Sequence, residues 1–346
     1  MGDEDPPRKR RQRYKGTHPR RFEEKYKELG AEPDAVEKAK ARGATPAGAH
    51  RPVMLDEVLD ALGPLEGATI LDCTLGWGGH AEALAKRASS VIALDRDGEE
   101  LARTEKRMTD AGLAIVARQS NYAGAAKVLQ ALGIDGVDGV LADFGVSSMQ
   151  LDRPERGLSF KNDGPLDMRM DRSRGETAAE WLARATEEEI ADALLRFGDE
   201  PDAARIASTI VRLAAEGRGP KTTAALASAV GIAKNVGPQR VRKKSTSSFH
   251  PATRTFQALR IVVNREHEAL AQLLRDLPWL VRPGGRVALL TFHSGEEAIV
   301  GEALRTQAAS GIWTAPPEEP RKPSPEETRE NPRARSARLW RVTRAG

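Results

Sequence analysis

The sequence predicts an α/β fold with a parallel, doubly wound sheet and an inserted, all-helical segment. Short apolar runs at 68–72, 91–95, 114–116 and 137–143 alternate with helical patterns at 79–88, 98–111 and 123–131. Strands that alternate with helices form parallel sheets. Between 178 and 229 the pattern is helical only, and a strand pattern returns at 286–292.

The remaining elements follow from the same periodicities. The compact fold is expected to begin at 50–54, with a helix before the first strand. We expect one long amphipathic helix over 255–280, a Pro-Gly-Gly turn at 283–285 and an edge strand at 339–342. The segment 315–335 is rich in Pro, Glu and Arg, which predicts an exposed and partly disordered stretch.

Composition sets limits on location and on the kinds of site. The 346 residues are 39% hydrophobic and 30% charged, with no run of eighteen apolar residues. This predicts a soluble, cytoplasmic protein without a signal peptide and with no role in a membrane. Cys73 is the single cysteine, so we expect no disulfide within the chain, no cysteine-based metal cluster and no metal site.

Three parts are predicted along the chain. Residues 1–48 form a basic arm, 49–150 and 251–346 form the domain of the doubly wound sheet, where a cofactor would bind, and 151–250 form a helical insertion on the substrate side. The arm has the charge to lie along phosphates, and a solvated tail is the alternative.

A glycine loop follows the first strand. Asp72 ends that strand, Gly76, Gly78 and Gly79 follow, and Asp95 ends the next strand. In doubly wound folds an acid about 20 residues beyond such a loop hydrogen-bonds ribose hydroxyls. A purely structural strand–helix turn is the alternative reading.

The acids favour one kind of nucleoside cofactor. Asp72 is badly placed for a pyrophosphate and well placed for an ammonium group. S-adenosylmethionine carries an amino-acid end, a sulfonium and a ribose diol, but no phosphate. The loop therefore predicts S-adenosylmethionine in preference to a dinucleotide, with Asp72, Asp95 and Asp143 at the carboxyl ends of their strands.

Several motifs together resemble the MraW (RsmH) family of bacterial ribosomal RNA methyltransferases. They lie at 50–54, 72–80, 143–152, 163–170, 250–261 and 292–294. The resemblance implies a Rossmann-like class I methyltransferase fold and methylation at N4 of a cytosine in the decoding region of 16S ribosomal RNA. It also implies that the cofactor contacts come from Gly78, Gly79, His80, Asp95, Tyr122, Asp143 and Gln150.

The chemistry of the target amine singles out Asp143. An acceptor beside the amine would hold the charge that develops there, so Asp143 is the catalytic candidate, with a pure cofactor role as the alternative. Phe144 is a candidate to stack on the base, or is a core aromatic. Methylation at C5 would need a cysteine nucleophile, and Cys73 beside the cofactor loop is poorly placed to act as one.

Further residues are candidates for the substrate side. Asp167 and Arg169 lie in a loop that is either substrate-facing or an interdomain turn. His250, Arg254 and Arg260 could meet RNA phosphates, or could serve helix structure and salt bridges. With the basic loop at 234–244, they could supply phosphate contacts. The family resemblance implies that the partner is 16S ribosomal RNA or the small ribosomal subunit. A homodimer stays open.

Two rival functions remain at this level. One is a non-catalytic RNA-binding assembly factor on a methyltransferase fold, which would bind RNA without transferring a methyl group. The other is a dinucleotide-dependent oxidoreductase, which would change nicotinamide absorbance on turnover.

Overall fold

The computed structural model describes residues 52–146, 148–236, 250–315 and 319–346. Arg51–Gly346 form one compact unit. The predicted basic arm at 1–48 lies outside the described residues, as does most of the basic loop at 234–244.

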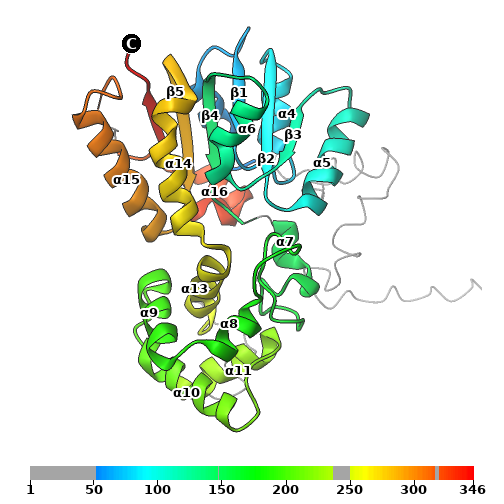
Figure 1. Ribbon diagram of the computed structural model, residues 1–346, viewed down its shortest axis with the longest axis vertical. Helices are drawn as coiled ribbons and strands as arrows, with labels where there is room; N and C mark the ends of the chain where they lie inside the picture. The colour runs from blue at the N-terminus through cyan, green and yellow to red at the C-terminus, as the bar shows by residue number, and fades with distance from the viewer. Residues whose placement is uncertain (1–51, 147, 237–249, 316–318) are drawn as a thin grey trace, which may run out of the picture. The chain divides into compact units, whose positions relative to one another are not determined.

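A single six-stranded sheet organises the described chain (Figure 1). Its order is β3-β2-β1-β4-β5-β6, and every neighbouring pair is parallel except β5 with β6. The α/β prediction is confirmed, and 339–342 lies in the edge strand as expected. The strands are β1 (Thr69–Asp72), β2 (Ser90–Asp95), β3 (Val116–Gln119), β4 (Val137–Asp143), β5 (Val281–Thr291) and β6 (Arg338–Thr343).

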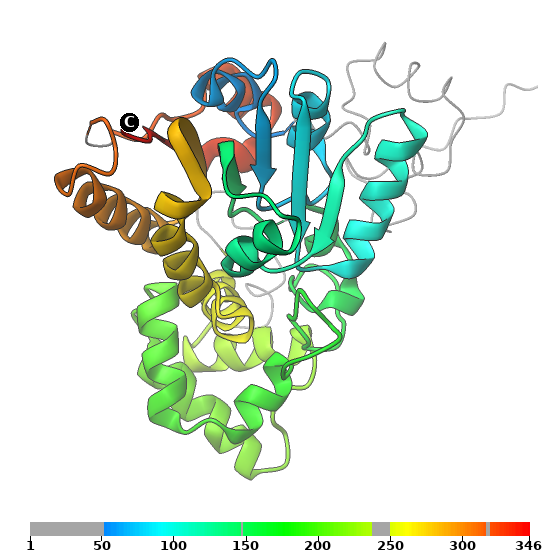
Figure 2. The same cartoon turned by 45° about the horizontal axis from the view of Figure 1, so that its top comes forward.

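Helices cover both faces of the sheet (Figure 2). One face carries α3 (Leu55–Leu62), α4 (Gly79–Ala85) and α5 (Gly98–Asp110), and the other carries α6 (Ala125–Ala131), α14 (Glu266–Leu280) and α15 (Ser294–Ala309). Side chains on a strand point alternately to the two faces, so Val140 and Ala142 of β4 pack in the core with α14 while Leu141 packs in the core with α3. Such strands are apolar throughout, and this is why the sequence showed short continuous runs.

The helical insertion has a core of its own. It contains α8 (Ala178–Arg184), α9 (Glu187–Gly198), α10 (Ala203–Ala215) and α11 (Thr223–Ala233), and no strand lies between 148 and 236. Thr177 and Thr186 begin α8 and α9 with reciprocal capping boxes. Phe256 and Leu259 of α13 (Thr253–Asn264) belong to the same core, so packing continues past the predicted boundary at 250 (Figure 1).

The prediction of one helix over 255–280 is wrong. The chain forms α13 and α14, separated by Arg265 in the left-handed region at φ 50°. Asn264 stabilises this break, because its buried amide accepts from Met170 N and donates to the carbonyls of Met168 and Arg260. Tertiary hydrogen bonds therefore outweigh a helical pattern that carries no local break signal.

Three further expectations need correction. The third strand is β3 rather than 114–116. The turn at 283–285 is an irregularity inside β5, where the register with β4 shifts between Val137 and Gly139. Most described residues of 315–335 are exposed, as expected, but the segment also contains regular structure: Glu327 in α16 (Pro325–Glu330) accepts from Met54 N at 2.6 Å, and Ala334 in the 3₁₀ turn η4 (Pro332–Ser336) is buried.

Short elements connect these parts. They are the 3₁₀ turn η2 (Tyr122–Gly124), helix α7 (Ser148–Asp152) and the 3₁₀ turn η3 (Pro154–Arg156).

Candidate active site

Three carboxylates mark the carboxyl edge of the sheet. β1, β2 and β4 are adjacent parallel strands, and they end at Asp72, Asp95 and Asp143. Thr74 ties two of these ends together, because its Oγ1 accepts from Asp143 N at 2.7 Å. The edge where open α/β sheets bind ligands is therefore acidic.

Asp72 has hydrogen-bonding capacity to spare. It is buried, and its Oδ1 accepts from Thr74 N at 2.9 Å. Within the described chain its Oδ2 has no hydrogen-bond partner. Burial and the neighbouring carboxylates raise the pKa of Asp72 to about 7. An unpaired buried carboxylate oxygen calls for a donor, and the ammonium of an amino-acid group has the right charge.

Asp95 braces the glycine loop. Its Oδ2 accepts from Gly76 N and its Oδ1 from Asp97 N, both at 2.8 Å. Burial raises the pKa of Asp95 to about 6. Each oxygen keeps a second lone pair, so the partly exposed carboxylate can still accept from ribose hydroxyls.

The glycines of the loop are required by close packing. Gly78 has φ 75°, and a Cβ there would lie 2.7 Å from Cγ2 of Thr104 in α5. A Cβ on Gly79 would lie 2.5 Å from Pro52 Cγ. Gly76 also has a positive φ, 49°. Packing by itself accounts for Gly78 and Gly79, and backbone conformation for Gly76, so contact of these glycines with a cofactor remains a prediction.

His80 and Asp143 form a buried pair. The Nε2 atom of His80 lies 3.0 Å from the Val53 carbonyl, which only accepts, so Nε2 carries the ring proton and Nδ1 faces Asp143 Oδ2 at 3.9 Å. Burial raises the pKa of Asp143 and lowers that of His80. Asp143 Oδ1 accepts from Gly145 N at 2.9 Å, which leaves Oδ2 toward His80.

Phe144, which follows Asp143 in the chain, packs against a second aromatic ring. Tyr122 and Phe144 meet edge to face, with ring centroids 5.5 Å apart. Phe144 is buried in the core of the sheet, and Tyr122 donates to the Glu266 carbonyl at 3.3 Å. Phe144 is thus a core aromatic in this structure, and its stacking on a base remains a prediction.

The substrate-side charges are engaged within the protein. Arg169 Nε donates to Asp167 Oδ1 at 2.7 Å, and Arg260 makes two hydrogen bonds to Glu266, at 3.0 and 2.9 Å. The Arg260 pair matches the salt-bridge alternative to RNA contact, whereas the role of the Asp167–Arg169 loop stays a prediction. His250 stacks on Phe160 with centroids 4.0 Å apart, whereas Arg254 is exposed on α13.

Sequence reasoning missed several polar residues at this edge. Asp97 is buried and accepts from Gln150 Nε2 at 3.0 Å. Its place just before α5, followed by Gly-Glu-Glu, was a helix N-cap signal that could have found it. Glu296 is buried and accepts from Phe292 N at 2.7 Å, and no local pattern marked it.

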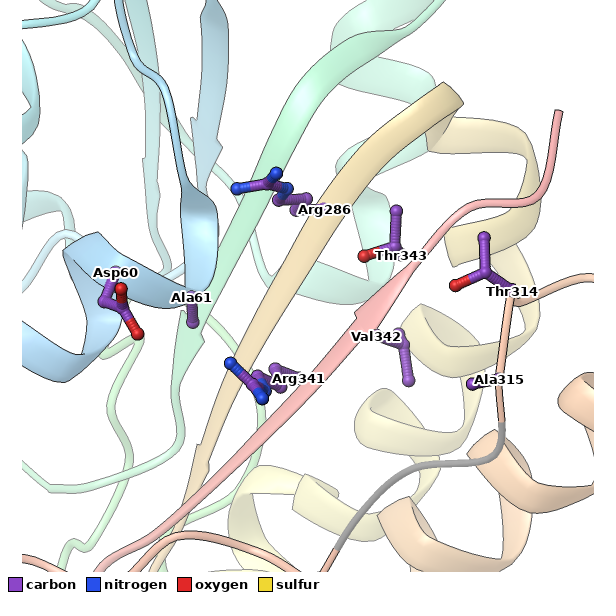
Figure 3. A pocket seen from close by; sticks show the side chains of 8 residues that line it. All are labelled: Asp60, Ala61, Arg286, Thr314, Ala315, Arg341, Val342 and Thr343. Carbon is purple, nitrogen blue, oxygen red and sulfur yellow. The ribbon is translucent and has the colours of Figure 1, made fainter.

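A separate groove lies where α3 meets the edge of the sheet (Figure 3). It has a volume of about 430 Å³, and Asp60, Arg286, Arg341 and Thr343 are among its lining residues. No predicted site residue lines it. In the described ranges no cluster of His, Cys, Asp and Glu fits a metal ion, and no helix is long and apolar enough to cross a membrane.

Comparison with known proteins identifies close relatives. The model of the MraW methylase family matches residues 47–345. Ribosomal RNA small subunit methyltransferase H 1 of Lachnoclostridium phytofermentans is 40% identical over 98% of this chain and 94% of that protein. Ribosomal RNA small subunit methyltransferase H of Anaeromyxobacter sp. (strain K) is 45% identical over 85% of this chain and 97% of that protein.

Solved structures resemble the chain more distantly. An rRNA methylase from Streptococcus thermophilus covers 84% of this chain and 94% of its own, with 10% identity and a TM-score of 0.37. A likeness at this score supports no inference about the site.

Proposed function

The chain belongs to the MraW methylase family, and we propose that it transfers a methyl group from S-adenosylmethionine to N4 of a cytosine in 16S ribosomal RNA. The observation that carries the proposal is the acidic edge, where three adjacent strands end in Asp72, Asp95 and Asp143 and one buried oxygen of Asp72 lacks a partner among the described residues.

The acidic edge fits the parts of the methyl donor. Asp72 Oδ2 would accept from the ammonium group, and Asp95 would accept from the ribose diol. Gly76, Gly78 and His80 would line the donor between these acids. Tyr122 and Gln150 complete the donor-side residues that we propose.

Asp143 is the residue that we propose for the chemical step. S-adenosylmethionine supplies a methyl group already activated on a sulfonium. The lone pair of the cytosine amine is shared with the ring, so the amine is a poor nucleophile. Asp143 Oδ2 would accept an N–H of this amine, which favours its pyramidal form and stabilises the positive charge that develops on nitrogen. The rest of catalysis is alignment and exclusion of water.

Cys73 supports N4 over C5. Attack at C6, which C5 methylation requires, needs a thiolate. Cys73 is buried, and burial raises the pKa of its thiol well above the usual value. Within the described chain, therefore, no cysteine suits that role.

The names of the relatives support the choice of substrate. Both are ribosomal RNA small subunit methyltransferases, and the matches span most of this chain. We carry their substrate class to this protein, with the decoding region of the small subunit as the target and the cytoplasm as the location. A base held in a site of this kind must leave its stack first.

Radiolabelled S-adenosylmethionine with undermethylated small subunits tests the proposal. Nucleoside analysis should find the label on N4 of cytidine. Label on another atom would overturn N4 as the site of methylation. RNA binding without label would indicate an assembly factor, and an absorbance change with a nicotinamide dinucleotide would indicate an oxidoreductase.

A further inference from the structure

We infer that Asp97 and Arg156 are positioning residues that fix the Gln150 amide with its oxygen available to the methyl donor. The inference rests on the proposed function, because it assumes that the donor binds beside Asp95 and Gln150. It gives a role to the buried Asp97–Arg156 ion pair, whose charged groups make no hydrogen bond to the three edge carboxylates in the described structure.

Asp97 accepts four hydrogen bonds with one carboxylate. Its Oδ1 caps α5 by accepting from Glu99 N at 3.1 Å and Glu100 N at 3.3 Å. Its Oδ2 accepts from Gln150 Nε2 at 3.0 Å and from Arg156 at 2.5 Å. Because all these partners are donors, the buried carboxylate is fully used inside the protein.

This arrangement dictates the orientation of the Gln150 amide. A carboxylate only accepts, so the amide group that faces Asp97 must be the NH₂ and the oxygen must point elsewhere. Within the described residues Gln150 Oε1 makes no hydrogen bond, although Gln150 is largely buried. The ribose hydroxyls, the adenine amine and the ammonium of the donor are all hydrogen-bond donors, and an acceptor oxygen matches them.

The same pair is linked directly to the donor-side loop. Asp97 N donates to Asp95 Oδ1 at 2.8 Å, so Gln150 lies two hydrogen-bond links from the proposed ribose acid. A displacement of Asp97 would therefore shift both Asp95 and Gln150.

Arg156 holds Asp97 from the other side. Its side chain is buried, and it donates to Asp97 Oδ2 and to the Met170 carbonyl at 2.8 Å. Its own carbonyl accepts from Met168 N at 3.0 Å. This buried guanidinium joins the loop after β2 to the segment that leads into the helical insertion. It thereby fixes Asp97 Oδ2, the oxygen that also accepts from Gln150.

A neighbouring ion pair offers a matched control. Glu100 is buried in α5 and pairs with Arg153 at 3.1 Å, so it joins the same two segments. Among the described residues its side chain makes no hydrogen bond to Gln150 or Asp95, and it reaches Asp95 only through its charge. Glu100→Gln should therefore perturb folding in the same place without changing how Gln150 is oriented.

The test is a double-mutant cycle in donor affinity. Asn is also a good helix N-cap, so Asp97→Asn should keep the start of α5. Its side-chain amide can donate as well as accept, so the Gln150 amide is no longer held in one orientation and can flip. We expect calorimetry with S-adenosylmethionine to give about a tenfold weaker Kd for Asp97→Asn, the worth of one charge-assisted bond. In a Gln150→Ala background, Asp97→Asn should change Kd by less than about twofold, because the group it positions is gone.

Thermal unfolding, measured alongside, separates positioning from folding. Glu100→Gln should lower Tm yet leave Kd within about twofold of wild type. If Asp97→Asn does not fold, Arg156→Lys keeps the buried charge and can replace it in the cycle with Gln150→Ala. The expected increase in Kd is then smaller, about threefold. Additive losses in the cycle, or an equal loss in Glu100→Gln, would overturn the positioning role while the proposed function stands. A wild-type protein that binds no donor would reject both.

Discussion

The acidic edge of the sheet and the charged residues of the substrate side differ in how much hydrogen-bonding capacity they leave open. At the edge, one buried oxygen of Asp72 is unpaired within the part of the chain that the structure describes, and Asp95 and Asp143 are held mainly by backbone N–H groups. On the substrate side, Asp167 with Arg169 and Arg260 with Glu266 satisfy each other through their side chains.

The contrast shows where a ligand can be recognised. A buried carboxylate without a partner costs free energy until a donor arrives, whereas a buried pair already has its partner. Charge in the sequence does not distinguish the two cases. We therefore expect substitutions to act on ligand binding at the edge and on folding at the engaged pairs.

The largest expected effect is on folding, from Arg260→Ala. This change leaves Glu266 buried and unpaired, and breaking such a pair costs about 3–5 kcal/mol. Urea unfolding measures the loss. Arg205→Ala, at an exposed pair with Asp202, is the control and should cost less than about 1 kcal/mol. A similarly small loss for Arg260→Ala would mean that this arginine is free to meet RNA.

The next effect is on catalysis, from Asp143→Ala. Removing a group that stabilises charge in the transition state typically lowers kcat by about 10²–10³-fold. Single-turnover methyl transfer measures it, with Asp138→Asn as the control on the same strand. Asp138 is half-buried near the start of β4, at the opposite end of the strand from Asp143, and it pairs with Arg282. The amide of Asp138→Asn can still accept from Thr69 N, so this variant should keep normal turnover. Normal kcat with a weaker Kd in Asp143→Ala would restrict Asp143 to donor binding.

Asp72→Asn should weaken donor binding by about 1.5–3 kcal/mol, the worth of a charge-assisted hydrogen bond. The amide still accepts from Thr74 N, so the strand end is kept. In the wild type, affinity should also fall as the pH drops below about 7, because protonated Asp72 cannot pair with an ammonium. Calorimetry at several pH values measures both effects, and a pH-independent affinity in wild type would argue against this pairing.

In the donor-free protein, stability should depend on pH in the opposite direction to donor affinity, which provides a control. The pKa of Asp72 is raised in the folded state from 3.8 to about 7, so folding favours its protonated form. Its contribution to stability is full below about pH 4 and is lost as the pH rises through about 7. Asp72→Asn should therefore flatten the decline of Tm over this range, and an unchanged profile would contradict the burial of the charge.

The smallest expected effect is from Arg254→Ala. Arg254 is exposed, so stability should change by less than about 0.5 kcal/mol. If it meets a phosphate, RNA affinity should fall and the salt dependence of binding should lose a slope of about 0.7–0.9. Filter binding at several salt concentrations measures the slope. An unchanged slope would remove Arg254 from the RNA contacts.

The sequence predicted best what local patterns determine. Apolar runs ending in Asp72, Asp95 and Asp143 located three strand ends, because a strand buried on both faces must be apolar along its whole length. The glycine loop was found for a similar reason, since tight turns admit few other residues. The family resemblance is confirmed by the match over residues 47–345.

Tertiary contacts decided what the sequence could not show. Arg265 breaks a helix because Asn264 is bonded to a distant loop, and no turn residue announces it. Glu327 becomes part of the fold by accepting from Met54, far away in the chain. Whether Arg260 faces RNA or a carboxylate depended likewise on the bend that brings Glu266 to it.

A structure of the protein with S-adenosylmethionine is the most direct test of the acidic edge. We predict that the ammonium nitrogen lies within hydrogen-bond distance of Asp72 Oδ2 and the ribose hydroxyls within that distance of Asp95. A donor bound elsewhere, with Asp72 Oδ2 still unpaired, would contradict the account.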